Sequence, residues 1–144
     1  MEGTVHRHEY RVIYADTDAG GIVYNGNYLR FFEIGRTELM RESVCSYKDV
    51  EKRGLILPVT ETYLRYKAPA LYDDLIIIET KLVEIKKFSC KFTYKIVRKA
   101  PDGEKEKLLT RGYTIHASVN FQGKLAPLPE DLVASMQPVL FRKN

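Results

Sequence analysis

Two aspartates, Asp16 and Asp18, stand directly before an aromatic-rich apolar segment, in the stretch YADTDAGGIVYNGNYLRFFEIGRTE from Tyr14 to Glu38. A carboxylate can act as a nucleophile or as a general base, and free N–H groups at a helix start can stabilise a negatively charged oxygen. Asp, Gly and Asn also favour tight turns and helix caps. Taken by themselves, these residues favour the turn and the cap.

The segment after the two aspartates has the spacing of an amphipathic helix. From Tyr28 onward, apolar positions recur at intervals of three and four, with charged residues between them, which predicts a helix of about four turns. Gly35 on this stripe costs about 1 kcal/mol of helix propensity relative to Ala, so we expect another backbone to approach there. The predicted buried stripe consists of Tyr28, Phe31, Phe32, Gly35 and Leu39.

Strand patterns lie on both sides of this helix. Residues 4–14 alternate before it, and a short second helix after Ser46 closes at Gly54. The remaining strand-like segments are 55–69, 75–84, 88–98 and 108–121, with turns at 72–74, 86–87 and 101–103 and a short last helix after Pro129. This order predicts an α+β fold in which an antiparallel sheet curls around one helix. The open sheet edges predict a homodimer.

Composition limits the remaining choices. The chain has 144 residues, 44% of them hydrophobic, and no apolar run long enough for a membrane span, which predicts one soluble, cytoplasmic domain over residues 1–144. Cys45 and Cys90 have no paired spacing and are expected to be free buried thiols. The net charge of +4 suits an anionic ligand without specifying one.

Two stretches together resemble a known family: the one quoted above and YLRYKAPALYDDLIIIET further along. The pattern Asp-x-Asp-x-x-Gly-x-Val-Tyr with a downstream Pro-Ala-x-Tyr-Asp-Asp is similar to that of the hot-dog-fold acyl-CoA thioesterases. The likeness is greatest to the hydroxybenzoyl-CoA thioesterase branch, including the Tol–Pal-associated acyl-CoA thioesterases, and it runs from about Glu9 to Pro129. It implies about five strands wrapped around a long helix, and an active site shared between two subunits of a dimer or a dimer of dimers.

The resemblance also implies roles for single residues. Asp18 matches the catalytic carboxylate, acting as nucleophile or as base for a water, and the backbone N–H of Asn25 matches the group that polarises the thioester carbonyl. Asp16 is expected to be a structural turn residue. Lys86 and Lys87 match basic residues near the nucleotide end of coenzyme A, although two lysines in a turn are also ordinary surface residues.

Three further residues could contact the substrate. Glu33 could reach the acyl pocket of the partner subunit or pair with an arginine at the surface. Tyr14 and Thr60 could flank the site or simply pack within strands. Asn25 departs from many Tol–Pal-associated relatives, which have histidine there. Since asparagine does not titrate near neutral pH, we expect the backbone N–H of this residue to be what matters.

The expected activity is hydrolysis of a small or medium acyl-CoA to free acid and coenzyme A, without a cofactor or a metal. The alternatives are an acyl-carrier-protein thioesterase and a non-catalytic acyl-CoA-binding module. A hot-dog dehydratase would use histidine, but none lies between His8 and His116. His6 and His8 have no third ligand nearby for a metal. Nucleic acid is not expected, because no basic residues cluster with aromatics in the sequence.

Overall fold

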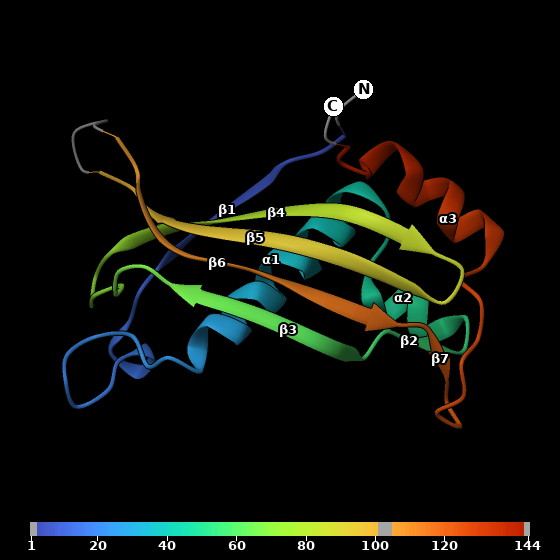
Figure 1. The fold of residues 1–144 in the computed structure, drawn as a ribbon, viewed down its shortest axis with the longest axis horizontal. Coiled ribbons are helices and arrows are strands. Elements are labelled where there is room, and N and C mark those ends of the chain that lie inside the picture. Colours follow the sequence, from blue (N-terminus) through green and yellow to red (C-terminus); the bar gives the residue numbers. More distant parts are fainter. Residues whose placement is uncertain (1–2, 101–104, 143–144) are drawn as a thin grey trace.

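A five-stranded antiparallel sheet packs one of its faces against a long helix, α1, in the computed structural model, which describes residues 3–100 and 105–142 (Figure 1). The sheet order is β1-β4-β5-β6-β3, and β2 pairs with β7 in a separate small sheet. The elements are β1 (His6–Arg11), η1 (Tyr14–Asp16), α1 (Asn27–Ser43), α2 (Tyr47–Lys52), β2 (Leu55–Ile56), β3 (Val59–Tyr66), β4 (Leu75–Lys86), β5 (Ser89–Arg98), β6 (Lys107–Ala117), β7 (Val119–Asn120), α3 (Glu130–Met136) and η2 (Gln137–Val139). The predicted α+β architecture is therefore confirmed.

Several element boundaries differ from those predicted. The first strand ends at Arg11, so Tyr14 lies in the 3-10 turn η1 and not in a strand. The last predicted strand is divided at Ser118, because β6 stays in the large sheet while β7 leaves it to pair with β2. The turn predicted at residues 101–103 lies outside the described residues. Ser46 caps α2 as predicted, since its side chain accepts a hydrogen bond from the Asp49 N–H.

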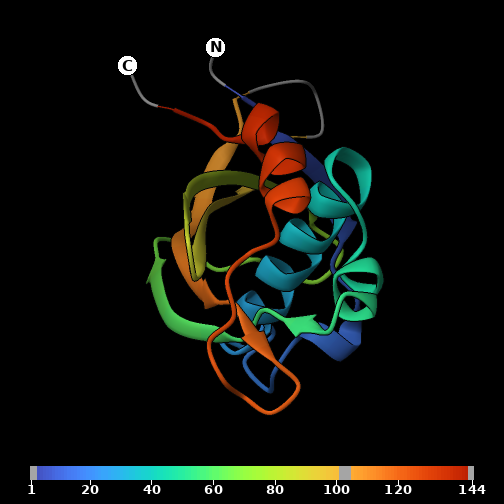
Figure 2. The ribbon, with the colours of Figure 1, turned by 90° about the vertical axis from the view of Figure 1, so that its right-hand side faces the viewer.

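The helix α1 presses closely on the sheet: it crosses behind the strands in Figure 1 and lies beside them, within the curve of the sheet, in Figure 2. Phe31, Phe32 and Leu39 on its buried stripe have no exposed surface. A Cβ at Gly35 would collide with Thr80 Oγ1 and lie 2.8 Å from Ile78 Cγ2. The helix packs tightly at Gly35, but the prediction that a backbone approaches there is wrong, because its neighbours are side chains of β4. Among the described residues, no helix has the length and apolar character needed to cross a bilayer.

The faces of β5 and β6 that meet α1 differ in chemistry. The inward residues of β5 are largely apolar, whereas β6 buries the polar side chains of Thr110, Thr114 and His116. His116 Nδ1 lies 2.9 Å from the Leu57 carbonyl, which only accepts, so Nδ1 carries the proton. The neutral ring then accepts from the Thr114 hydroxyl at Nε2, 2.8 Å away, and the Thr114 oxygen accepts from Tyr94. With His116 neutral, these hydrogen bonds pair the buried polar atoms of Tyr94, Thr114 and the imidazole ring.

His116 should make the stability of the fold depend on pH. Burial lowers the pKa of His116 from its ordinary 6.5 to about 4. Between these two pKa values the unfolded chain binds more protons than the folded chain. The contribution of His116 to the unfolding free energy is therefore fully present above pH 6.5 and is lost as the pH falls toward 4. We expect the wild type to lose about 2 kcal/mol of unfolding free energy from this source between pH 7.5 and pH 5. Urea unfolding of His116→Gln should show that much less pH dependence, and an unchanged slope would contradict the assignment.

Candidate active site

The chain reverses tightly between η1 and α1. The Asp18 N–H donates to the Ile22 carbonyl at 2.9 Å, and the Gly21 N–H donates back to the Asp18 carbonyl at 3.0 Å. Gly21 has a φ of +80°, which a residue with a side chain adopts only under strain. The glycines of the motif therefore shape a tight reversal of the chain, with Asp18 at its beginning.

Asp16 fixes the start of this loop to its neighbours. Its side chain is buried, accepts from the Tyr10 hydroxyl at 2.8 Å and from the Ile13 N–H at 3.0 Å, and pairs with Arg30 of α1. Its carbonyl accepts from the Asn27 side chain at 2.7 Å. Asp16 thus connects β1, the loop and α1, so its predicted structural role is confirmed.

Asp18 has the opposite environment. It is exposed, and its Oδ1 accepts only the local hydrogen bond from the Gly20 N–H, at 2.8 Å. Its Oδ2 makes no hydrogen bond within the part of the chain that the structure describes. A carboxylate with a free oxygen at the surface remains available to a ligand.

Asn25 lies just before the first turn of α1, whose N-cap is Gly26. Its carbonyl accepts from the Tyr66 hydroxyl at 2.9 Å and from the Tyr28 N–H at 3.4 Å. Its own N–H donates to no acceptor in residues 3–100 and 105–142. An unused N–H at the positive end of a helix of 17 residues is suited to stabilising an anionic oxygen.

A groove of about 300 Å³ opens at this point between the loop and the end of β3. Ile22, Asn25 and Tyr28 line one side of it, and Tyr66 and Lys67 line the other. Sequence analysis did not single out Tyr66 or Lys67. In the sequence, the tyrosine that ends the YLRY strand pattern was the only sign of this groove, because no short-range pattern connects β3 to the start of α1.

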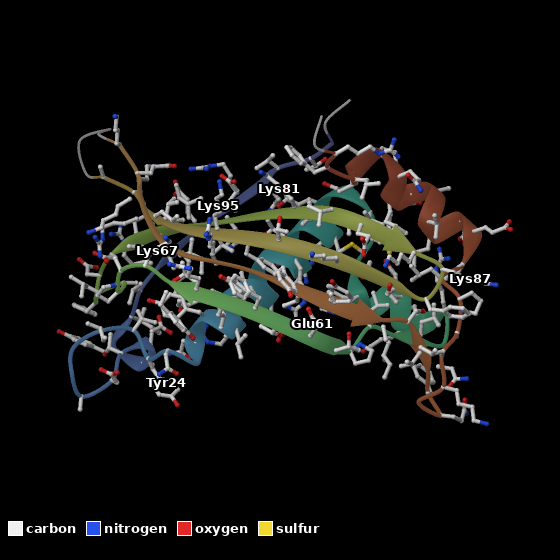
Figure 3. All side chains as sticks on the ribbon, viewed as in Figure 1. Tyr24, Glu61, Lys67, Lys81, Lys87 and Lys95 are labelled. Atoms are coloured by element: carbon white, nitrogen blue, oxygen red, sulfur yellow. The ribbon has the colours of Figure 1, made fainter. Side chains whose placement is uncertain are left out.

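The other predicted site residues lie elsewhere in the chain. Tyr14 is 72% exposed and stacks on Tyr72, with ring centroids 3.7 Å apart. Thr60 donates to the Ile115 carbonyl at 3.2 Å near the start of β3, about 20 Å along that strand from Tyr66. Lys87 lies at the β4–β5 turn, at the far end of the molecule from Tyr24 (Figure 3).

Lys86 and Glu33 complete the predicted set. Lys86 is the last residue of β4, next to Lys87 in the β4–β5 turn, and approaches Glu84, with 3.7 Å between Nζ and Oε1. Glu33 is exposed on α1 and lines a second groove of about 420 Å³, together with Tyr47, Leu57 and Pro58. Asn25 lines the groove at the start of α1, Asp18 lies on the loop that leads to it, and the other five predicted residues lie outside this groove. Their shared role in one site remains a prediction.

The described residues contain no group of three or more His, Cys, Asp or Glu side chains placed to hold a metal ion. His6 instead lies 2.6 Å from a carboxylate oxygen of Glu42 through its Nε2.

Comparison with known proteins identifies this architecture. A protein of unassigned function from Thermus thermophilus, TT1821, has the same fold with a TM-score of 0.84 and 28% identity, over 94% of this chain and 98% of that one. A mutant 4-hydroxybenzoyl-CoA thioesterase solved with 4-hydroxybenzoyl-CoA also has this fold, with a TM-score of 0.82 and 22% identity, over 91% and 97%. The fold is thus the hot-dog fold of the thioesterases, as predicted.

The sequence itself makes the assignment more specific. Residues 12–136 match the model of the thioesterase-like superfamily. The chain is also 37% identical over 97 residues to the acyl-CoA thioester hydrolase YbgC of Escherichia coli, covering 67% of this chain and 72% of that protein. The chain belongs to the thioesterase-like superfamily.

Proposed function

We propose that this protein is an acyl-CoA thioesterase that hydrolyses small or medium acyl-CoA to free acid and coenzyme A. The observation that carries the proposal is that the loop leading into α1 holds both an exposed carboxylate, Asp18, and the unused N–H of Asn25. The similarity to a YbgC acyl-CoA thioester hydrolase supports the same reaction. No cofactor or metal enters this chemistry.

The reaction uses the two groups on opposite atoms of the thioester. The Asn25 N–H and the dipole of α1 stabilise the negative charge that develops on the carbonyl oxygen. Asp18 either attacks the carbonyl carbon to form a mixed anhydride, which water then hydrolyses, or deprotonates a water that attacks directly. In both routes the carbon–sulfur bond breaks and coenzyme A leaves as the thiol. Asn25 needs no titratable side chain for this role.

We also propose that the site is completed by a second copy of the chain. The strand β3 is an edge strand, and Val59, Tyr63 and Tyr66 along it are 44%, 41% and 50% exposed. Antiparallel pairing of β3 with β3 of a partner would place the beginning of one strand beside the end of the other. The partner's Thr60, about 20 Å from the groove in one chain, would then lie next to it.

The same pairing supports roles for the remaining predicted residues. The Glu33 groove adjoins the start of β3 through Leu57 and Pro58, and the apolar part of its lining suits a small acyl group. Lys86 and Lys87 lie at the same end of the molecule as the start of β3, so in a pair they approach the partner's site. Tyr14 lies in η1, directly before the loop that carries Asp18. It would contact the substrate as part of the same chain that provides Asp18.

The test is release of free thiol from a panel of short, medium, long and aromatic acyl-CoAs. We expect turnover with at least one short or medium member, and the preferred acyl group will define the pocket. Release only from acyl carrier protein would favour the carrier-protein alternative, and binding without release would favour a binding module. We place the enzyme in the cytoplasm, because free Cys45 and Cys90 suit a reducing compartment.

Tyr66 should support the oxyanion contact without taking part in the chemistry. Its hydroxyl holds the Asn25 carbonyl, so Tyr66→Phe should loosen the peptide that precedes the helix. One lost hydrogen bond of about 1 kcal/mol corresponds to roughly a fivefold lower kcat, with a smaller change in KM. Steady-state thiol release measures both constants, and Tyr63→Phe on the same strand serves as the control. An unchanged kcat in Tyr66→Phe would remove Tyr66 from the site.

A further inference from the structure

The sheet face that points away from α1 carries an unusual row of like charges. Pairing places Lys95 of β5 directly opposite Arg111 of β6, and Arg111 directly opposite Arg65 of β3. All three side chains are exposed. Like charges directly opposite each other on neighbouring strands destabilise a sheet. This cation row therefore lowers the stability of the fold unless something else neutralises it.

No carboxylate of the described residues neutralises the cation row. None of the ion pairs between residues 3–100 and 105–142 includes Lys95, Arg111 or Arg65. The nearest acidic neighbour in the register is Glu79, opposite Lys95, and its Oε2 is already paired with Arg7 at 2.7 Å. The positive charge of the row is thus left for a partner outside the chain.

The cation row borders a groove with aromatic walls. The groove has a volume of about 570 Å³ and is lined by Lys95 and Arg111, with Lys81, Phe141 and Arg142 along one side. Figure 3 shows Lys81 and Lys95 on this open face, which no described helix covers. This volume is in the range of pockets for small ligands.

Two tyrosines occupy the neighbouring row of the register. Tyr63 and Tyr113 are opposite each other and stack, with ring centroids 5.6 Å apart, and Lys91 Nζ lies 4.3 Å from the Tyr113 ring centroid. Glu61 accepts from the Tyr113 hydroxyl and so orients that ring. The 41% exposed Tyr63 ring provides an aromatic surface beside the cations. Sequence analysis found no such cluster, because these residues come from different strands.

We propose that this groove is a binding site for a nucleoside di- or triphosphate, separate from the thioester site. Arginine and lysine recognise phosphate oxygens by charge-assisted hydrogen bonds, and three adjacent strands spread the cation row over about 10 Å. The Tyr63 ring offers a stacking surface for the base. A second copy of the chain is a poorer occupant, because facing copies would bring two cation rows together. The proposal does not depend on the thioesterase activity.

The experiment is calorimetric titration of the full-length protein with ATP at low and moderate salt. Removing two charges in Lys95→Gln/Arg111→Gln should weaken ATP binding by about tenfold or more. The same variant should have a higher thermal midpoint than the wild type without ATP, since the repulsion within the row is relieved. The matched control, Lys48→Gln/Lys124→Gln, removes the same charge from two exposed lysines that belong to neither site and should bind ATP like the wild type.

Several results would overturn the proposal. ATP binding that is unaffected in Lys95→Gln/Arg111→Gln, or equally weakened in both double variants, would mean that ATP responds to net charge or to the coenzyme A subsite. Tighter binding of a single-stranded oligonucleotide than of ATP, lost in Lys95→Gln/Arg111→Gln, would assign the face to nucleic acid instead. A change in oligomeric mass in that variant, measured by light scattering, would make the face an interface between copies.

Discussion

Asp18→Asn should lower kcat for acyl-CoA hydrolysis by about 10³-fold while leaving the fold intact. The amide can neither attack the thioester carbon nor accept a proton from water, so the carboxylate chemistry is lost. The amide oxygen can still accept the Gly20 N–H that Asp18 Oδ1 accepts at 2.8 Å, which keeps the loop in place. Because Asp18 is exposed, the unfolding free energy should change by no more than about 0.5 kcal/mol. The measurement is thiol release at saturating substrate.

Two controls separate chemistry from structure in this experiment. Glu130→Gln removes an exposed carboxylate from α3 and should leave turnover unchanged. Asp16→Asn removes the buried carboxylate two residues before Asp18 and should cost about 2 kcal/mol of stability, since its amide NH2 would face hydrogen-bond donors that the carboxylate accepts. Binding of a non-hydrolysable acyl-CoA analogue should be retained in Asp18→Asn. If binding disappears together with turnover, Asp18 acts in ligand binding and the acyl-CoA-binding alternative gains support.

Gly35→Val should have the largest effect on stability, a loss of about 3 kcal/mol or more. A Cβ alone at this position would collide with Thr80 Oγ1, and the two added methyl groups of valine deepen the clash with Ile78. Overpacking of a tight core site costs about 1–3 kcal/mol and occasionally more, whereas replacing glycine in a helix with alanine gains only about 1 kcal/mol. The steric cost therefore outweighs the gain in helix propensity. Urea unfolding at pH 7.5 measures the difference.

Thr37→Val provides the matched control for Gly35→Val. It places the same β-branched side chain on the same helix at a half-buried position, with almost no change in shape. We expect its unfolding free energy to stay within about 0.5 kcal/mol of the wild type. Gly35→Ala tests the sign directly, because a stabilised protein would show that α1 has room above Thr80 and that the glycine is not required by packing.

Local periodicity was sufficient for the elements that pack by one face. The three-and-four spacing from Tyr28 to Leu39 correctly predicted α1, and alternation through Cys90, Phe92 and Tyr94 predicted β5. Turn chemistry placed Lys87 correctly between two strands, but Lys86 is the last residue of β4 and not part of the turn. Periodicity failed to place Tyr14, because the alternating pattern continues past Arg11. In the structure, Asp16 closes a 3-10 turn at that point.

In the candidate site, too, residues close together in the sequence could be predicted and residues from a distant strand could not. The spacing of the motif placed Asp18 and Asn25 in the one loop between η1 and α1, since their separation along the chain is short. Tyr66 and Lys67 could not be predicted, because they reach the groove from a strand about 40 residues away. The roles of Glu33, Thr60 and the turn lysines depend on a partner subunit and remain predictions.

The sequence by itself determined the class of fold, the family pattern and the two groups proposed for catalysis, since each follows from residue types at short spacing. Tertiary structure decided which residues from different strands become neighbours. It buried His116 beneath α1, turned Asp16 inward while leaving Asp18 exposed, and aligned Lys95, Arg111 and Arg65 in one row. Strand register determines which of these side chains face each other. Register is set by packing across the whole sheet, because a shift of one residue moves every side chain of a strand to the opposite face.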